Sequence, residues 1–333
     1  HISLVSGDAL DINVAAKGGG SENKAHLMML NPSDNIVDHV LNAIPEMGAG
    51  WCPPGVLGIG VGGTADKAML LAKESLMAPI NIQDLQKTGP KSRIDELRLE
   101  LYEKINQLGI GAQGLGGLTT VLDVKLLDYP THAASLPVAI IPNCAANRHI
   151  HFQLNGYGPA QFIPPNLDLW PKEVWKPSEN ITRVNLENVT KEEISTWTIG
   201  QSLLLSGKIL TARDAAHKKL KAMAESGEKL TRNLNLKGRF IYYVGPVNPV
   251  GDEVVGPAGP TTSARMDSYT ELMLDHYGIL GMIGKAERGD KAIASIKKSQ
   301  GAYLVAIGGS AFLVAQAIKS SKVIAFPELG MEA

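Results

Sequence analysis

The sequence predicts an α/β protein built from two domains. Its 333 residues are about twice the length of a typical single domain. Hydrophobic residues make up 44% of the chain and charged residues 20%, which is enough apolar material for packed cores. Beyond about residue 183, apolar strands alternate with glycines and helical segments, as is typical of layered α/β structure with parallel strand pairs. We therefore expect one domain at residues 1–155, a linker at 156–182 and a second domain at 183–333.

The first domain is predicted to mix strands and helices. Apolar runs predict strands at residues 1–5, 56–61, 120–126 and 138–142. Amphipathic segments predict helices at residues 35–44, 65–77 and 92–108. Glu100 and Lys104 lie four apart in the last of these helices, a spacing that supports an exposed helix face. Residues 78–83 are expected to form a loop.

Prolines crowd residues 156–182, where Gly-Pro, Pro-Pro, Trp-Pro and Lys-Pro pairs follow one another. Repeated prolines continue neither a helix nor an inner strand, so this stretch is expected to be the linker. Beyond it, the expected strands are residues 240–244, 279–283, 303–307 and 323–326. The expected helices are residues 262–277, 290–298 and the segment from Gly309 to about residue 319.

Charge and composition exclude several classes of function. A formal net charge of -1 argues against a basic nucleic-acid surface and gives no support for a polybasic membrane anchor. Aromatic residues are 5% of the chain, too few for a platform that stacks single-stranded nucleic acid. No run of about 18 uncharged apolar residues predicts a transmembrane helix. Two cysteines cannot build a disulfide framework, so a reduced, cytoplasm-like compartment is expected.

Glycine is frequent, with 35 residues, and part of the excess lies in two G-x-G-x-x-G matches. The match from Gly58 to Gly63 follows an apolar strand and precedes a helix, the context of a dinucleotide-binding turn. The acidic residue expected about 20 positions further on, Asp84, lies in loop-like sequence. The second match, at residues 109–114, follows a helix, which is the wrong order. Dinucleotide binding thus stands beside two alternatives, close backbone packing and an anion-binding turn.

The two cysteines, Cys52 and Cys144, both lie in proline-containing turns. They are 92 residues apart and the chain has no C-x-x-C pair, so spacing alone favours two buried structural thiols. Turns nevertheless hold thiolates where a metal cluster can reach them, and backbone N–H groups there can donate to sulfur.

The histidines give weaker signals than the cysteines. His149 and His151 would share one strand face, which makes either half a metal site or, as we expect, a surface pair. His132 is flanked by small residues, where a ligand can approach closely. A lone histidine is nevertheless more often structural than catalytic.

Two expected helix starts in the second half combine hydroxyl groups with an arginine, Arg213 in one and Arg265 in the other. Free N–H groups, the helix dipole and a guanidinium together can bind a carboxylate or phosphate. Lys285 follows the end of a predicted strand. The three cations could converge on a small polyanion; the alternative is ordinary capping with solvated charges.

Longer strings of residues carry a family resemblance. In the first half they are CPPG at 52–55, GIGAQGLGG at 109–117, PTHAAS at 130–135 and NCAA at 143–146. In the second half they are LTARDAAH at 210–217, YYVGP at 242–246, GPAGPTT at 256–262, RMD at 265–267 and KAERG at 285–289. On both sides of the linker the chain resembles class I fumarate hydratases, an iron–sulfur-dependent family related to L-tartrate dehydratase.

The resemblance implies a [4Fe-4S] cluster held by three cysteines, with one iron left open as a Lewis acid. Cys52 and Cys144 match two of these ligands. The family's third cysteine lies upstream, in a Cys-Gln-Asp-Thr-Gly segment with an acid/base aspartate, and this chain begins at His1 without that segment. We therefore expect the chain to be truncated at both ends, with a natural N-terminal extension that supplies the cysteine and the aspartate.

The resemblance also implies a substrate site made of cations, a hydroxyl and backbone amides. The implied dicarboxylate-binding residues are Arg213, Arg265, Lys285, Gln113 and Gly18. Thr261 would be the catalytic base, and His132 would act near a substrate carboxylate.

The expected function is the reversible hydration of fumarate to L-malate in the tricarboxylic acid cycle. Alternatives are L-tartrate dehydratase or mesaconate hydratase of the same family and, in a different class, a dinucleotide-binding protein. The expected architecture is an α/β iron–sulfur catalytic domain, incomplete here, followed by a swivelling-type β/α domain. The resemblance further suggests a cytoplasmic homodimer, or a mitochondrial one in a eukaryote, whose partner is a small dicarboxylate rather than a nucleic acid or a membrane.

Overall fold

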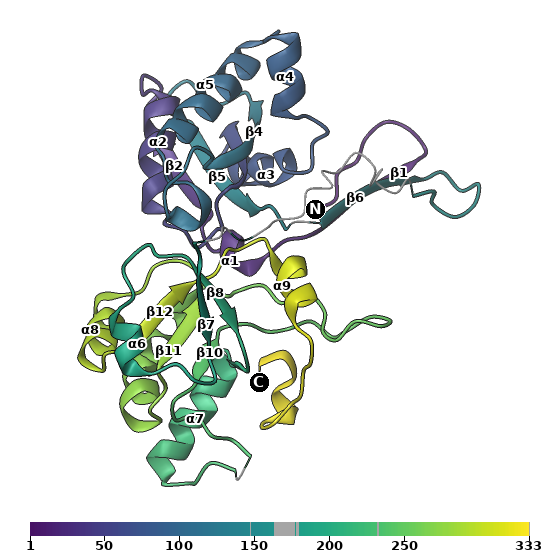
Figure 1. Cartoon of the computed structure of the whole chain (residues 1–333). Helices are drawn as coiled ribbons and strands as arrows, with labels where there is room; N and C mark the ends of the chain where they lie inside the picture. The colour runs from purple at the N-terminus through teal and green to yellow at the C-terminus, as the bar shows by residue number, and fades with distance from the viewer. Residues whose placement is uncertain (147, 163–176, 178–179, 232, 333) are drawn as a thin grey trace.

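The computed structural model describes residues 1–146, 148–162, 177, 180–231 and 233–332. The first and second halves of the chain form two bodies, which meet near the short helix α1 (Gly19–Glu22) (Figure 1). Most of the predicted linker, residues 163–176 and 178–179, lies outside the described residues. The α/β class and the two-domain organisation agree with the expectation.

The first half is organised around a four-stranded mixed sheet in the order β2-β5-β3-β4. Its strands are β2 (His26–Leu30), β3 (Gly55–Gly62), β4 (Val121–Tyr129) and β5 (Leu136–Cys144). Strand β3 runs parallel to β4 and antiparallel to β5, which is antiparallel to β2. The helices of this half are α2 (Ile36–Glu46), α3 (Ala65–Ser75), α4 (Ile82–Thr88) and α5 (Arg93–Gln107), with a 3₁₀ turn, η1 (Ala112–Gly114).

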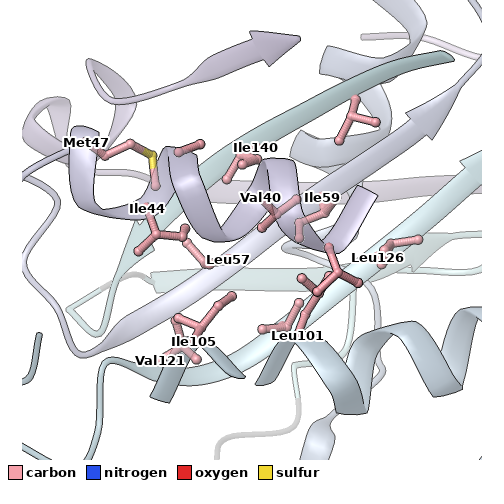
Figure 2. Packing of buried hydrophobic residues seen from close by; sticks show 14 of the residues in the cluster. Val40, Ile44, Met47, Leu57, Ile59, Leu101, Ile105, Val121, Leu126 and Ile140 are labelled. Atoms are coloured by element: carbon pink, nitrogen blue, oxygen red, sulfur yellow. The ribbon is translucent and has the colours of Figure 1, made fainter. Parts of the chain in front are cut away.

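Successive side chains along each strand of this sheet point to opposite faces, and both faces pack against helices. Ile59 and Ile140 face α2 and α5 and form one apolar cluster with them (Figure 2). Ile141, one residue further on, faces the other side and packs in a cluster with Ala72 of α3. The sheet is therefore covered by helices on both faces.

The glycines from Gly58 to Gly60 lie inside β3 rather than in a turn. A Cβ at Gly58 would collide with the carbonyl of Ala72, and a Cβ at Gly60 with the carbonyl of Ala68. Without side chains at these two positions, α3 packs close against the strand. Close backbone packing, one of the alternatives for this motif, thus explains both glycines.

A two-stranded ribbon extends from the first body (Figure 1). It pairs β1 (Leu10–Ala16) antiparallel with β6 (Arg148–Leu154). The prediction of a strand at residues 1–5 is wrong, since the first strand begins at Leu10. The apolar run at residues 1–5 pairs with no described strand, whereas β1 has β6 beside it along its whole length.

The second half contains a parallel four-stranded sheet in the order β12-β11-β10-β9. Its strands are β9 (Leu210–Thr211), β10 (Phe240–Tyr242), β11 (Gly281–Gly284) and β12 (Ala302–Val305), and a separate parallel pair is β7 (Thr182–Asn185) and β8 (Leu203–Ser206). The helices are α6 (Lys191–Ser195), α7 (Asp214–Ser226), α8 (Asp290–Lys298) and α9 (Ala311–Ala317). Among the described residues, this half also contains the 3₁₀ segments η3 (Ser263–Tyr269) and η5 (Pro327–Glu332) and a π-helical turn, η4 (Leu272–His276).

Both faces of the parallel sheet are also covered. Ile241 and Met282 pack with α7, η3 and η4 on one face. Phe240 and Ile283 pack with β7, β8 and part of α9 on the other. The second half is therefore layered, with the carboxyl edge of its sheet left for loops.

Three predicted segments differ from the structure. Residues 262–277 form η3 and η4 instead of an α-helix, since Thr262 bridges to Lys285 and Ser263 N–H donates to the Lys285 carbonyl at 3.0 Å. Residues 323–326 form no strand, and Phe326 instead packs its side chain into the core around α7. The expected loop at 78–83 leads into α4, whose start Asn81 caps by accepting from Asp84 N–H at 2.7 Å.

In the described ranges, no helix combines the length and the hydrophobicity that a membrane crossing requires.

Candidate functional site

Loops of the second half meet at the carboxyl edge of its parallel sheet. The carboxyl ends of parallel strands lie together, and open α/β sheets bind ligands at that edge. Arg213 follows β9, Lys285 follows β11, and Gly308 comes shortly after β12. Thr261 is held near the exit of β10, because its N–H donates to the Tyr243 carbonyl at 2.7 Å. Strand order thus gathers the predicted cations and the hydroxyl along one edge.

Both cysteines lie at one end of the sheet in the first half. Cys144 is the last residue of β5, and the antiparallel register places it opposite Gly55, the first residue of β3. Cys52 precedes Gly55 by three residues. Cys52 is buried and Cys144 half-buried, and both are free thiols. The register therefore brings the two thiols to the same place.

The thiols of the first half meet the lysine of the second half. The Nζ of Lys285 donates to the Sγ of Cys52 at 2.6 Å, and Lys285 is only 8% exposed. A hydrogen bond with the Cys52 thiol lowers the pKa of Cys144 to about 6, and the Ala146 N–H and the charges of Lys285 and Lys17 act in the same direction. The same thiol–thiol hydrogen bond, together with burial, raises the pKa of Cys52. The pair thus favours one thiolate, on Cys144, at neutral pH.

Gln113 joins the loops that surround the cysteines. Its Nε2 donates to the Ala49 carbonyl at 2.9 Å, and its Oε1 accepts from Gly308 N–H at 2.7 Å. Its own N–H donates to the Pro53 carbonyl at 2.7 Å. A Cβ at Gly308 would lie 2.5 Å from the Cys52 sulfur, so only glycine lets this loop approach so closely. The buried amide of Gln113 therefore links the two halves beside the thiols.

The glycine loop that leads into α1 lies against the same lysine. A Cβ added at Gly20 would lie 3.1 Å from Lys285 Nζ and 3.4 Å from Thr262 Oγ1. Gly18 has open space around it, and its carbonyl accepts from Ser21 Oγ at 3.0 Å. Of these two glycines, the structure brings Gly20 to the lysine and places Gly18 at the start of α1.

Thr261 and Arg265 form the next part of the edge. The Nη2 of Arg265 donates to Thr261 Oγ1 at 2.7 Å and pairs with Asp214 at 3.0 Å. Lys285 N–H donates to the Thr261 carbonyl at 3.2 Å, so the threonine lies between the two cations. A guanidinium at this hydroxyl favours the deprotonated oxygen that a threonine base needs.

Arg213 extends the cationic edge beyond Arg265. It pairs with the Glu332 carboxylate, and its carbonyl accepts from the Nδ1 of buried His217 at 2.7 Å. Burial, followed by the charge of Arg265, lowers the pKa of Arg213. Each of the two arginines therefore holds a carboxylate of the chain itself.

The histidines singled out in the sequence, His132, His149 and His151, are exposed on the first half. His132 is exposed on the turn between β4 and β5, where its Nδ1 accepts from Ala134 N–H at 3.1 Å. His151 contacts Asp11 across the β1–β6 ribbon, and both side chains are exposed. Within the described residues, no group of three or more His, Cys, Asp or Glu side chains could hold a metal ion.

Sequence reasoning missed two residues that build the site. Glu287 accepts from Ala49 N–H at 3.2 Å and so ties the loop after β11 to the first half. Gly308 contributes its N–H to Gln113. The sequence did contain local patterns at both residues, since Glu287 belongs to the KAERG string and Gly308 to a glycine pair after a strand. These patterns do not reveal a contact between the two halves of the chain.

The donor set fits part of an iron–sulfur site. Thiolates are the usual ligands of such clusters, and hydrogen bonds to the sulfurs tune the reduction potential of the cluster. Cys52 and Cys144 offer two adjacent sulfurs, one with a lowered pKa, and Lys285 and the Ala146 N–H supply charge and a hydrogen bond there. These residues fit two of the ligand positions of a cluster.

Comparisons with known proteins match both halves. A family model described as fumarate hydratase (Fumerase) matches residues 1–153, and one described as fumarase C-terminus matches residues 156–333. The anaerobic class I fumarate hydratase of Escherichia coli (strain K12) is 33% identical over an alignment of 353 positions, which covers 99% of this chain and 62% of that protein. Fumarate hydratase 2 of Leishmania major is 33% identical over an alignment of 354 positions, which covers 99% of this chain and 60% of that protein.

A further relative carries another name. A Methanocaldococcus jannaschii protein provisionally named L(+)-tartrate dehydratase subunit alpha is 48% identical over 145 residues, 42% of this chain and 48% of that protein. The chain spans about three-fifths of the length of the fumarate hydratases it matches.

Proposed function

Because the chain belongs to the fumarate hydratase (Fumerase) family, we propose that it catalyses the reversible hydration of fumarate to L-malate. The observation that carries this proposal is that a thiol of the first half lies in contact with the cationic sheet edge of the second half. Cys52, a thiol of the first half, accepts a hydrogen bond from Lys285, and Lys285 is bonded through Thr261 to Arg265 at the sheet edge of the second half. A hydro-lyase acting on a dianion needs a Lewis acid beside a cage of cations.

The proposed cofactor is a [4Fe-4S] cluster, with Cys52 and Cys144 as two of its ligands. Such a cluster, when bound, would supply a Lewis acid for the hydroxyl that is added or removed. Lys285 keeps the sulfur of Cys52 hydrogen-bonded, and Gln113 holds the surrounding loops in place.

The chain's own residues then bind the substrate and move a proton. Arg265 and Arg213 would exchange their internal partners, Asp214 and Glu332, for carboxylates of the substrate, and Lys285 would bind a carboxylate as well. After releasing its own proton to solvent, Thr261 Oγ1 would take the proton from the malate carbon and become a neutral hydroxyl again. The guanidinium of Arg265 stabilises the negative charge that this oxygen carries before the transfer. His132 would act near a substrate carboxylate, and Gly18 would contribute a backbone amide.

The finer points of architecture and setting belong to the same proposal. The second half would be a swivelling-type β/α domain, and the assembly a homodimer, for which the ribbon β1–β6 offers exposed apolar side chains such as Val14 and Ile150. The free thiols suit a reducing compartment, the cytoplasm or, as in the name of a Leishmania major relative, the mitochondrion.

A second candidate substrate is L-tartrate. The tartrate-dehydratase-named relative is 48% identical over its matched stretch, against 33% for the fumarate hydratases over nearly the whole chain. Both dehydrations would use the same thiols and the same cations.

The test is an assay of the full-length protein, purified and reconstituted with iron and sulfide under anaerobic conditions. Fumarate, L-tartrate and mesaconate are offered separately, and loss of substrate is followed together with the product formed. Conversion of fumarate to L-malate with the highest kcat/KM supports the proposal. Turnover of tartrate alone would replace fumarate as substrate, and no turnover of any of the three would refute the hydro-lyase assignment.

A further inference from the structure

A buried arginine, Arg288, forms an ion pair with the half-buried Asp267 beside the cations of the candidate site. Arg288 Nε donates to Asp267 Oδ1 at 2.6 Å, and its Nη2 donates to Thr270 Oγ1 at 2.6 Å. The Arg288 side chain is 2% exposed and that of Asp267 22%. Lys285 lies three residues before Arg288 on the loop after β11, and Arg265 lies two residues before Asp267 in η3. The pair therefore ties together the two segments that carry these cations.

Two tyrosines fix the position of the arginine. The Arg288 guanidinium carbon lies 5.0 Å from the ring centre of Tyr303 and 5.7 Å from that of Tyr243. The Tyr303 hydroxyl also donates to the carbonyl of Ala286, the residue that follows Lys285, at 2.7 Å. The loop between Lys285 and Arg288 is thus held by its backbone as well as by the ion pair.

The free-energy cost of burying the Arg288 charge argues that the ion pair serves to position the two segments it joins. Charges are expensive to bury, and a buried ion pair often contributes no net stability relative to apolar side chains. In the part of the chain that the structure describes, the buried Nη1 of Arg288 has no hydrogen-bond partner. Asp267 also accepts from Gly289 N–H at 2.7 Å, so both of its oxygens are committed to the loop after β11.

We propose that Asp267 and Arg288 are positioning residues that fix the distance between Lys285 and Arg265, and thereby select dicarboxylates of one length. This inference rests on the proposed function, since it takes these two cations as carboxylate ligands. Neither positioning residue touches the substrate. Without the pair, the backbone hydrogen bonds of Lys285 with Thr261 and Ser263 still join the two segments, but the side chains of Lys285 and Arg265 are held less tightly relative to each other. This lowers the affinity for a ligand that spans both cations more than it lowers the stability of the fold.

The test measures the affinities of malonate, succinate and glutarate, which differ by one methylene each, by calorimetry on the wild-type holoprotein and two variants. Asp267→Asn keeps the shape but removes the charge, and Arg288→Lys keeps the charge but loses the fork that reaches Asp267 and Thr270 together. The wild-type protein is expected to prefer succinate roughly tenfold over the shorter and longer acids. Both variants are expected to lose this preference, and the double variant to bind no worse than either single variant.

Two further variants complete the design. Glu271→Gln removes an exposed partner of Lys298, 3.3 Å away, and should keep the succinate preference. Tyr303→Phe keeps the ring but removes the hydroxyl that holds Ala286, and it should lose part of the succinate preference. If the ion-pair variants do not fold, this variant tests whether the position of the loop after β11 sets the preference. A wild-type protein that binds no dicarboxylate overturns both this inference and the proposed function. A wild-type protein that prefers succinate, with folded variants that keep the same preference, overturns the positioning role alone.

Discussion

The two halves of the molecule contribute different chemistry to one place. The first half brings Cys52 and Cys144 together through the register of an antiparallel strand pair. The second half brings Lys285, Arg265 and Arg213 together through the shared carboxyl edge of a parallel sheet. The proposed metal ligands and the proposed anion-binding cations are therefore on separate bodies, and the contact from Lys285 to Cys52 joins them. The difference teaches that the proposed reaction site needs both halves and lies where they meet.

The largest expected effect comes from removing a thiol of the first half. Cys144→Ser should abolish the visible absorption of the reconstituted protein and its hydration of fumarate, because a serine hydroxyl is a poor ligand for iron. Iron and sulfide content per chain measures the loss. The outcome that contradicts the assignment is a variant with wild-type iron and sulfide content.

Removal of a cation from the second half should weaken binding of the dicarboxylate. Lys285→Met is expected to cost about 2–5 kcal/mol of binding free energy for succinate, as when one partner of a buried, hydrogen-bonded charge pair is truncated. Calorimetry gives the affinity. Lys298→Met is the matched control, since Lys298 pairs with Glu271 and Asp275 on the exposed surface of the same half. Equal losses in the two variants would mean that general charge, rather than this site, attracts the ligand.

The link between the halves can be weakened without touching a thiol or a cation. Gln113→Met leaves the Ala49 carbonyl and the Gly308 N–H without their partner, at about 1–3 kcal/mol for each buried group. Urea unfolding measures the change in the free energy of unfolding. Gln201→Met removes an exposed hydrogen bond of 2.9 Å to Thr182 and should change it by less than about 0.5 kcal/mol. If both variants unfold at the same urea concentration, Gln113 is not a link.

The smallest expected effect is on the pH dependence of thiol chemistry in the metal-free protein. The pKa of Cys144 is lowered to about 6 by its hydrogen bond with Cys52, whereas an unfolded cysteine has a pKa of about 8.5. Alkylation, which consumes the thiolate, should therefore proceed at a constant rate above pH 7 and slow as the pH falls through 6. Since the folded value is the lower one, this group's contribution to stability is also lost as the pH falls through 6. An inflection at or above the unfolded value would contradict the thiol pair.

Local sequence patterns indicated the residues of the candidate site, but they did not indicate the contacts between those residues. The turns around Cys52 and Cys144 and the loops around Arg265 and Lys285 have local patterns, and the structure brings Lys285 into contact with Cys52 where the halves meet. The contact of Gln113 with Gly308 joins residues 195 apart, and no local pattern reports such a contact. For the same reason, no pattern indicated that Arg288 and Asp267 pair behind the site.

Errors in the predicted elements have a similar origin. The apolar runs at residues 1–5 and 323–326 have the composition of strands, but a strand also needs a neighbour to pair with. Residues 262–277 have helical periodicity, but the contacts of Ser263 and Thr262 with Lys285 fix the start of the segment. By contrast, α8 begins and ends as predicted, because its amphipathic pattern agrees with its packing.

The most direct test of the central claim, that both halves form one site, is the electron paramagnetic resonance spectrum of the reduced, reconstituted protein with and without succinate. The spectrum reports the group bound to the thiols, and succinate binds the cations. We predict that saturating succinate changes the spectrum of the wild-type protein and leaves that of Lys285→Met unchanged. A wild-type spectrum that does not change while calorimetry shows succinate bound would contradict the claim and place the dicarboxylate away from the thiols.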